Sequence, residues 1–398
     1  MLMKNTQKTK IYNGRIVTPY RIIPQGTLLI SEGKIIEVSN GDIDAPDALE
    51  IDARGNYIAP GFMDIHIHGG GGHDFMDGSV EAFLGVAETH VRYGTTSMVP
   101  TTLTSEKEGL LETLSLYEQA HAQNNKGAMF LGMHLEGPYL AMSQRGAQDP
   151  RYIRDPDPEE YKEVIAHSSV ISRWSAAPEL PGAIAFGQYL RSKGILAALA
   201  HTDAIYEDVI EAFENGYTLA THLYSGMSGV SRRNAFRYAG VIESAFILDE
   251  MDVELIADGI HLPAPLLKLA YKTKGADRIA LITDSMRGSG IPPAESVIGN
   301  FRTGLKVIIE DGVAKLPDRS AFAGSVATAD RLVRNMINMA DVPLIDAVRM
   351  MTSTPARIMG VLDKKGTLAV GKDADIVIFD EDINIQTTIV NGNVLYQK

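Results

Sequence analysis

The sequence of 398 residues predicts an α/β fold: a (β/α)8 barrel of the TIM type with a small β-sandwich formed by both chain termini. In the middle of the chain, eight short apolar runs alternate with helical stretches, which is typical of a parallel sheet built from βα units. The two ends are instead rich in β-branched residues interrupted by Asn-Gly and Glu-Gly turns. Polar residues that can bind metals follow the apolar runs, at the place where barrel enzymes carry their active sites.

The β-sandwich is expected to combine residues 1–57 with residues 363–398, and the barrel to occupy residues 58–362. Segments such as KIYNGRIVTP near the start and GKDADIVIFD near the end share the same β pattern. Simple tails would be more polar and less patterned, so the termini are predicted to meet in one small unit.

The eight apolar runs predicted as barrel strands lie within residues 57–68, 95–103, 128–138, 170–179, 195–204, 217–227, 253–262 and 278–286. Helices are expected between them, for example over 79–94, where a Ser cap begins the pattern and a glycine ends it. The interval 286–325 departs from this alternation and predicts a hairpin around Asp311-Gly312. Two closing helices are expected over 327–340 and 343–360.

Composition narrows the function classes. The net charge of −13 argues against nucleic acid or an anionic membrane as a partner, because both require a basic face. The absence of cysteine excludes disulfides, thiolate ligands and a cysteine nucleophile, so any metal must be held by His, Asp or Glu. The polar start of the chain and the lack of a long apolar run predict a cytoplasmic protein without a membrane span.

Metal-binding residue types follow seven of the eight apolar runs. His66 and His68 stand two residues apart, so on a strand both imidazoles point to one face. The other members of the predicted centre are Glu136 after the third run and His201 and His222 after the fifth and sixth. Each has an ordinary alternative: a Gly-rich turn for the pair, a cap or ion pair for the carboxylate, and a core histidine for each single imidazole.

Asp284 follows the eighth run, which neighbours the first in a closed barrel. This places the carboxylate beside the histidine pair, where it could act as a general base toward a metal-bound water. The alternative is a helix cap for the residues that follow.

The order HxH, Glu, His, His and Asp resembles the amidohydrolase superfamily. The longer strings HLEGP, THLY, ADGxH, LITD and AGS resemble its N-acetylglucosamine-6-phosphate deacetylase family, and the similarity runs over nearly the whole chain. This resemblance implies metal-dependent removal of an acetyl group from a phosphorylated amino sugar. It also implies a divalent cation at Glu136, His201 and His222, and a second at His66 and His68 with Glu136 as the bridge. Zinc is the first expectation for both ions, and iron, manganese, cobalt and nickel are the alternatives.

The resemblance further implies substrate contacts and a homodimer. In the family pattern, Arg233 reaches across the dimer interface to the sugar phosphate. The remaining contacts it implies are Ala147, Gln148, Ser225, Gly226, Asp258, His261, Phe322, Ala323 and Gly324.

Three positions depart from that pattern. Ser225-Gly226 stands where the family usually has Asn-Ala, Gln148 where it usually has His, and RRNAFRYAG where it usually has Arg-Glu-Pro-Gly. Two alternatives therefore stay open. One is another hydrolase of the superfamily, acting on a different N-acyl sugar, an N-acyl amino acid or a cyclic amide. The other is a metal-free scaffold that has lost catalysis.

Overall fold

A computed structural model describes residues 7–292 and 295–398. Its central sheet consists of parallel strands with the neighbour order β9, β11, β12, β13, β14, β17 and β18, and β6 pairs with the free side of β9. Each of the eight apolar runs contributes one of these strands, which confirms the predicted barrel. Their bounds are β6 (Phe62–Ile67), β9 (Thr95–Thr102), β11 (Met133–Glu136), β12 (Ile171–Ala176), β13 (Leu196–Leu199), β14 (Tyr217–Ala220), β17 (Asp252–Leu255) and β18 (Ile279–Leu281).

The barrel closes between its last and first strands through bonds that lie just beyond the strands themselves. The Asp284 amide donates to the His66 carbonyl at 2.9 Å, and the His68 amide donates to the Ser285 carbonyl at 2.9 Å. Closure is therefore made at the carboxyl ends of β6 and β18, among the residues predicted to carry the chemistry.

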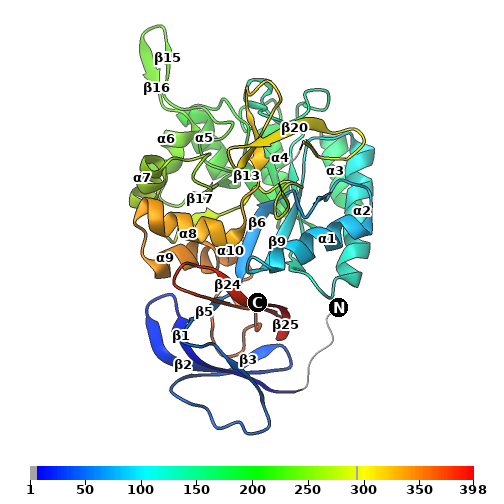
Figure 1. The fold of residues 1–398 in the computed structure, drawn as a ribbon. Helices are drawn as coiled ribbons and strands as arrows, with labels where there is room; N and C mark the ends of the chain where they lie inside the picture. Colours follow the sequence, from blue (N-terminus) through cyan, green and yellow to red (C-terminus); the bar gives the residue numbers. More distant parts are fainter. Residues whose placement is uncertain (1–6, 293–294) are drawn as a thin grey trace.

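Helices surround the barrel (Figure 1). α1 begins as predicted, because the Ser79 side chain accepts a hydrogen bond from the Ala82 amide at 3.2 Å. The α-helices are α1 (Val80–Val91), α2 (Lys107–Gln123), α3 (Pro158–His167), α4 (Ala183–Ser192), α5 (Tyr206–Glu214), α6 (Val241–Ile247), α7 (Ala264–Lys274), α8 (Ala329–Ala340), α9 (Leu344–Met350) and α10 (Ser353–Ile358). Among the described residues, no helix is both long and apolar enough to cross a membrane.

Both chain ends build one separate, mostly antiparallel sheet below the barrel (Figure 1). In this sheet β5 pairs with β1 on one side and with β23 on the other, which joins the two ends directly. Alternate residues of these strands form an apolar core of their own, including Ile11, Ile58 and Ile376. The strands are β1 (Thr9–Val17), β2 (Ile22–Ser31), β3 (Lys34–Asn40), β4 (Leu49–Asp52), β5 (Tyr57–Pro60), β23 (Ile376–Phe379), β24 (Ile385–Val390) and β25 (Asn393–Gln397).

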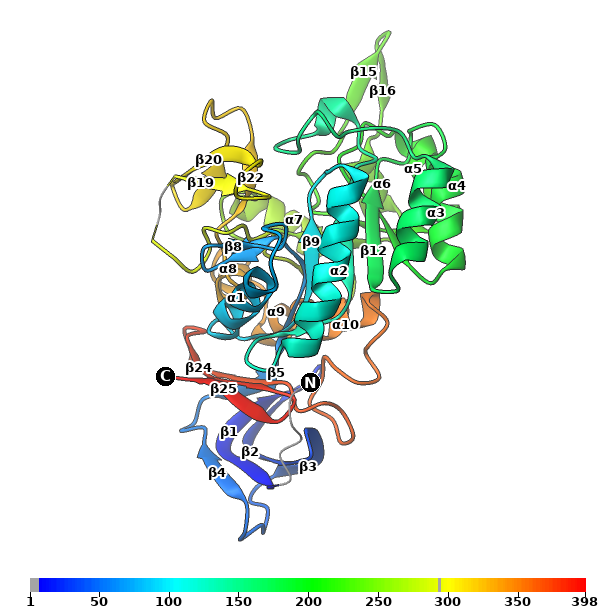
Figure 2. The same cartoon turned by 90° about the vertical axis from the view of Figure 1, so that its right-hand side faces the viewer.

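A four-stranded insertion follows the eighth barrel strand and lies over one side of the barrel mouth (Figure 2). The predicted hairpin is present, with left-handed φ angles of 53° at Asp311 and 75° at Gly312 between β20 and β21. Arg287 fixes the base of the insertion through paired hydrogen bonds to Asp77 at 2.9 and 2.8 Å. The insertion comprises β19 (Ser296–Ile298), β20 (Leu305–Glu310), β21 (Val313–Lys315) and β22 (Phe322–Ser325).

A second, isolated hairpin of β15 (Ser231–Arg233) and β16 (Phe236–Tyr238) projects from the same end of the barrel (Figures 1 and 2). The segment RRNAFRYAG, one of the three departures from the family pattern, forms most of this hairpin. Phe236 is 73% exposed at its tip.

Candidate active site

The barrel brings the six predicted residues together at its mouth. His66 is the second-to-last residue of β6, His68 lies just beyond the strand, and Glu136 is the last residue of β11. His201 and His222 each follow their strand by two residues. Together with Asp284, all of these side chains are buried. Their convergence follows from the parallel sheet, because the carboxyl ends of all its strands meet at one edge.

Glu136 lies at the centre of this group. Its Oε1 is 2.8 Å from His222 Nε2, 3.3 Å from His201 Nε2 and 3.7 Å from His66 Nε2. Its Oε2 is 3.4 Å from His68 Nε2. Two sets of possible ligand atoms therefore share this carboxylate, and within each set the atoms lie within 4.8 Å of one another. One set is His66, His68 and Glu136, and the other is Glu136, His201 and His222.

The chemistry of these donors fits a divalent cation. The His201 ring is held through Nδ1 by the Gln144 carbonyl at 2.8 Å, and the His66 ring through Nδ1 by Glu254 Oε2 at 3.3 Å. A proton on each Nδ1 leaves Nε2 bare and directed at Glu136, which is the form of imidazole that binds metals. Neutral imidazole with carboxylate suits zinc and other first-row transition metals.

Asp284 faces the histidine pair. Its Oδ1 is 3.1 Å from His68 Nε2 and 3.5 Å from His66 Nε2. Burial alone would raise the pKa of Asp284, but the neighbouring His66 and His68 outweigh it and hold the pKa below its usual value. The carboxylate is therefore ionised at neutral pH and able to accept a proton.

Gln148, one of the departures from the family pattern, also touches this centre. Its Nε2 donates to Glu136 Oε2 at 2.8 Å, while its Oε1 accepts from the Thr104 amide at 2.8 Å and the Thr104 hydroxyl at 3.0 Å. The side chain amide is thus oriented from both ends. Its NH2 group points at the centre, where it can donate a hydrogen bond.

A cavity of about 260 Å³ opens over the site and is lined by five of the six residues, all except His66. Seven of the ten predicted substrate contacts line it: Ala147, Gln148, Ser225, Gly226, His261, Phe322 and Gly324. Sequence reasoning did not single out Leu103 or Tyr224, which also line it, or Ile298, which the insertion contributes. Their pattern is that of core residues, and only the folded insertion and loops show that they face the cavity.

The other three predicted contacts lie elsewhere. Asp258 sits behind His261 and holds its ring, with Oδ2 2.7 Å from Nδ1. Ala323 is buried in a small apolar cluster under the insertion. Arg233 is exposed on the β15–β16 hairpin, where its guanidinium lies 5.4 Å from the ring centre of Tyr238. Within one chain, it is not part of the cavity wall.

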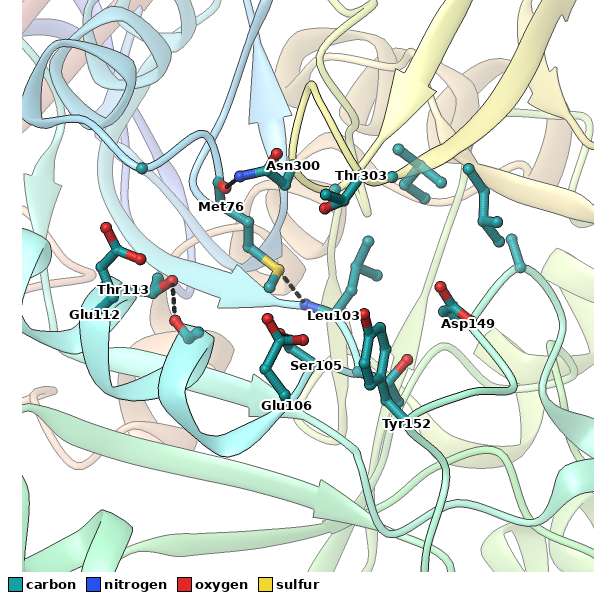
Figure 3. Close-up of a pocket in the computed structure, with 18 residues that line it drawn as sticks. Met76, Leu103, Ser105, Glu106, Glu112, Thr113, Asp149, Tyr152, Asn300 and Thr303 are labelled. Atoms are coloured by element: carbon teal, nitrogen blue, oxygen red, sulfur yellow. Dashed lines mark hydrogen bonds between the residues drawn. The ribbon is translucent and has the colours of Figure 1, made fainter.

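A smaller hollow of about 120 Å³ adjoins the cavity and shares Leu103, Ala147 and Ile298 with it. Figure 3 shows Glu106, Asp149 and Tyr152 around this hollow. Neither set of possible metal ligands in the described part of the chain lies here. The cavity over Glu136 is therefore the candidate active site.

Sequence reasoning missed two charged residues beneath the site, Arg173 on β12 and Glu254 on β17. Both side chains are fully buried and form an ion pair inside the barrel. Burial alone would raise the pKa of Glu254, but Arg173 and His66 lower it to about 2. A charged residue within an apolar strand was the available signal in both cases.

Comparison with known proteins agrees with this geometry. A model described as the Amidohydrolase family matches residues 57–395. The chain belongs to the amidohydrolase family. An N-acetylglucosamine-6-phosphate deacetylase from Bacillus subtilis (strain 168) is 34% identical, covering 96% of this chain and 95% of the relative. An N-acetylgalactosamine-6-phosphate deacetylase from Escherichia coli O157:H7 is 30% identical, with 92% and 97% covered.

A crystal structure of N-acetylglucosamine-6-phosphate deacetylase from Pasteurella multocida superposes with a TM-score of 0.91 at 29% identity. The match covers 97% of this chain and 99% of that one. These relatives confirm the family resemblance carried by HLEGP and THLY.

Metal uptake by this centre should release protons. Burial alone would lower the pKa of the two histidines, but Glu136 and Asp284 raise the pKa of His66 to about 9 and that of His68 to about 10. Below those values the metal-free protein holds a proton that a cation must displace, so the apparent affinity should weaken as pH falls, by about tenfold per pH unit for one proton. The Nε2 atoms of His66 and His68 face each other 3.2 Å apart, which leaves room for one proton between them.

Calorimetric titration of zinc into metal-free protein at pH 7, in two buffers of different ionisation heat, measures this release. We expect zinc binding to release at least about one proton per chain. A titration with no buffer dependence would contradict the protonated state of the metal-free histidines.

Proposed function

We propose that this protein hydrolyses the N-acetyl group of N-acetylglucosamine 6-phosphate, giving glucosamine 6-phosphate and acetate. The observation that carries the proposal is the buried centre in which Glu136 is shared by four imidazoles, with Asp284 beside it. The names of the relatives supply the substrate class. We further propose two divalent cations per chain, zinc first: His66, His68 and Glu136 would hold one, and Glu136, His201 and His222 would hold the other.

In this mechanism, bound cations would lower the pKa of a water molecule and polarise the amide carbonyl. Asp284, ionised and within 3.5 Å of both histidines of the pair, accepts the proton of the attacking water. It then returns that proton to the departing amine nitrogen. Gln148 donates its amide hydrogen toward the centre and helps to orient the carbonyl.

The phosphate needs positive charge that the cavity wall lacks. Among the described residues that line the cavity, there is no lysine and no arginine. His261 faces the cavity against Phe322, with ring centres 4.6 Å apart, and Asp258 fixes its orientation. We propose that Arg233 of a second copy completes the site in a cytoplasmic homodimer, because an arginine can hold a phosphate through two hydrogen bonds.

A second candidate substrate is N-acetylgalactosamine 6-phosphate, which differs only in the configuration of one hydroxyl group. The Escherichia coli relative with that activity favours it. The cavity wall also carries Ser225-Gly226 where the family usually has Asn-Ala. This change in the wall is compatible with a different sugar, such as the galactose epimer.

Acetate release over a panel of N-acetyl sugars tests the function. With zinc-loaded protein, we expect the highest kcat/KM on N-acetylglucosamine 6-phosphate and lower values on N-acetylgalactosamine 6-phosphate and on unphosphorylated N-acetylglucosamine. The highest value on the galactose epimer would select the second candidate. No acetate from any member would refute both.

Replacing Asp284 with Asn preserves its size but removes the basic oxygen. Turnover should fall by at least about 100-fold, as for the loss of a general base, while zinc at the Glu136, His201 and His222 site is retained. Turnover and metal content are measured on the same preparation. A variant with full zinc content and near-normal turnover would move the base role to another group, His261 first.

Replacing Arg233 with Ala should lower kcat/KM for the phosphorylated sugar by roughly 10- to 150-fold, equal to about 1.5–3 kcal/mol for a charge-assisted hydrogen bond. Activity on the unphosphorylated sugar should barely change. Arg232→Ala, on the same strand with its side chain on the opposite face, is the matched control and should have a smaller effect. Equal losses on both sugars would mean that Arg233 supports the fold or the dimer.

A further inference from the structure

Two fully buried, oppositely charged side chains lie inside the barrel beneath the metal-binding residues. Arg173 comes from β12 and Glu254 from β17, and neither side chain is exposed to solvent. The proposed reaction does not use them, since neither lines the cavity above. Burying two charges is costly, and a well-packed apolar pair often serves stability equally well. Their presence therefore calls for a reason other than stability.

Glu254 contacts one histidine from each set of possible ligands. Its Oε1 accepts a hydrogen bond from Arg173 Nη1. Its Oε2 lies 3.3 Å from His66 Nδ1 and 3.2 Å from the backbone amide of His222. The ring of His66 is thus held directly, while His222 is held only through its main chain.

Arg173 reaches the residues immediately before those histidines. Its Nη1 donates to the Ile65 carbonyl at 3.1 Å, and its Nη2 donates to the Thr221 hydroxyl at 2.9 Å. The guanidinium therefore ties β6 to the residue just after β14 from inside the barrel. It also compensates the charge of Glu254, so this carboxylate stays ionised and can accept a hydrogen bond from the Nδ1–H group of His66.

A carboxylate behind a metal-bound histidine fixes the tautomer and orientation of the ring and makes the ligand more basic. In His66 the held atom is Nδ1, and the free atom, Nε2, points to Glu136 and His68. His68 differs, because its Nδ1 is buried without a hydrogen-bond partner in the structure. The site formed with His68 therefore depends on how firmly His66 is held.

We propose that Arg173 and Glu254 are positioning residues of the metal centre, and that they set the affinity of the His66–His68 site for its cation. This inference rests on the proposed two-ion centre. The neighbouring site should depend on them much less, because Glu254 reaches it only through the His222 amide and Gln144 holds the His201 ring independently.

Zinc binding to metal-free protein, measured by competition with a chromophoric chelator, tests this without any assay of activity. Glu254→Gln preserves the shape but removes the charge. It should weaken zinc at the His66–His68 site by about 10- to 100-fold, the usual effect of losing a partner behind a ligand. His68→Ala removes that site and isolates the other one. In this background, Glu254→Gln should change zinc affinity by less than about threefold.

The matched control is Asp252→Asn on the same strand. Asp252 pairs with Arg357 at 2.6 Å and, in the structure, bonds to none of the metal-binding residues. This variant should lower the unfolding temperature while zinc affinities stay as in the wild type. If Glu254→Gln behaves like this control, or weakens zinc equally with and without His68, the pair is merely structural and the proposal fails.

Glu254→Gln leaves Arg173 buried without its partner, which can prevent folding. The double variant Arg173→Met/Glu254→Gln removes both charges and should fold while showing the same loss of zinc at the His66–His68 site. A folded double variant with wild-type zinc affinities would overturn the proposal. So would a wild-type protein that binds one zinc whether or not His68 is present. Failure of the sugar panel, in contrast, would refute the proposed function and leave the zinc comparison intact.

Discussion

The structure depends most on one buried carboxylate. Glu136 is 2% exposed and lies within 3.7 Å of a nitrogen of four imidazoles that come from three separate barrel strands. A buried negative charge without partners would be prohibitively costly, so these rings and Gln148 must face it, or a cation must be present. Burial alone would raise the pKa of Glu136, but His66, His201 and His222 hold it well below the usual range. The buried carboxylate therefore depends on the histidines for its stability, and the histidines depend on the carboxylate.

Residues of the candidate active site, Asp284 included, also complete the barrel. Three of them have left-handed backbone, with φ of 46° at His201, 30° at His222 and 48° at Asp284, each shortly after its strand ends. Non-glycine residues adopt such angles at a cost of order 1–3 kcal/mol, and they persist where the surroundings impose them. At Asp284 the imposing contacts are those between its amide and the His66 carbonyl, which help to close the barrel. Fold and site are thus joined at the last and first strands.

Some site residues could be predicted from the sequence and others could not, depending on whether a local sequence pattern marks them. The ends of β6, β11, β13 and β14 could be located because polar residues interrupt apolar runs there, and a parallel sheet brings all such ends to one edge. Arg173 and Glu254 could not be interpreted, since the depth of a side chain inside a barrel depends on how neighbouring strands align. The β11–β12 pairing, for example, shifts register directly beside Arg173. The wall residue Ile298 lies in an insertion whose position over the mouth no local pattern specifies.

In the proposed homodimer, the charge around the cavity would link substrate recognition to assembly. The chain carries 50 acidic and 37 basic residues, and the carboxylates nearest the metal-binding nitrogens, Glu136 and Asp284, would repel a phosphate. Bound cations would offset those two charges but would be occupied with the amide. The described residues on the cavity wall include no lysine or arginine, whereas the exposed β15–β16 hairpin carries Arg232, Arg233 and Arg237. An isolated two-stranded hairpin is marginally stable by itself, so packing against a second copy would both order this one and deliver its arginines. On that proposal, a variant that cannot dimerise would lose its preference for phosphate while its metal centre stayed intact.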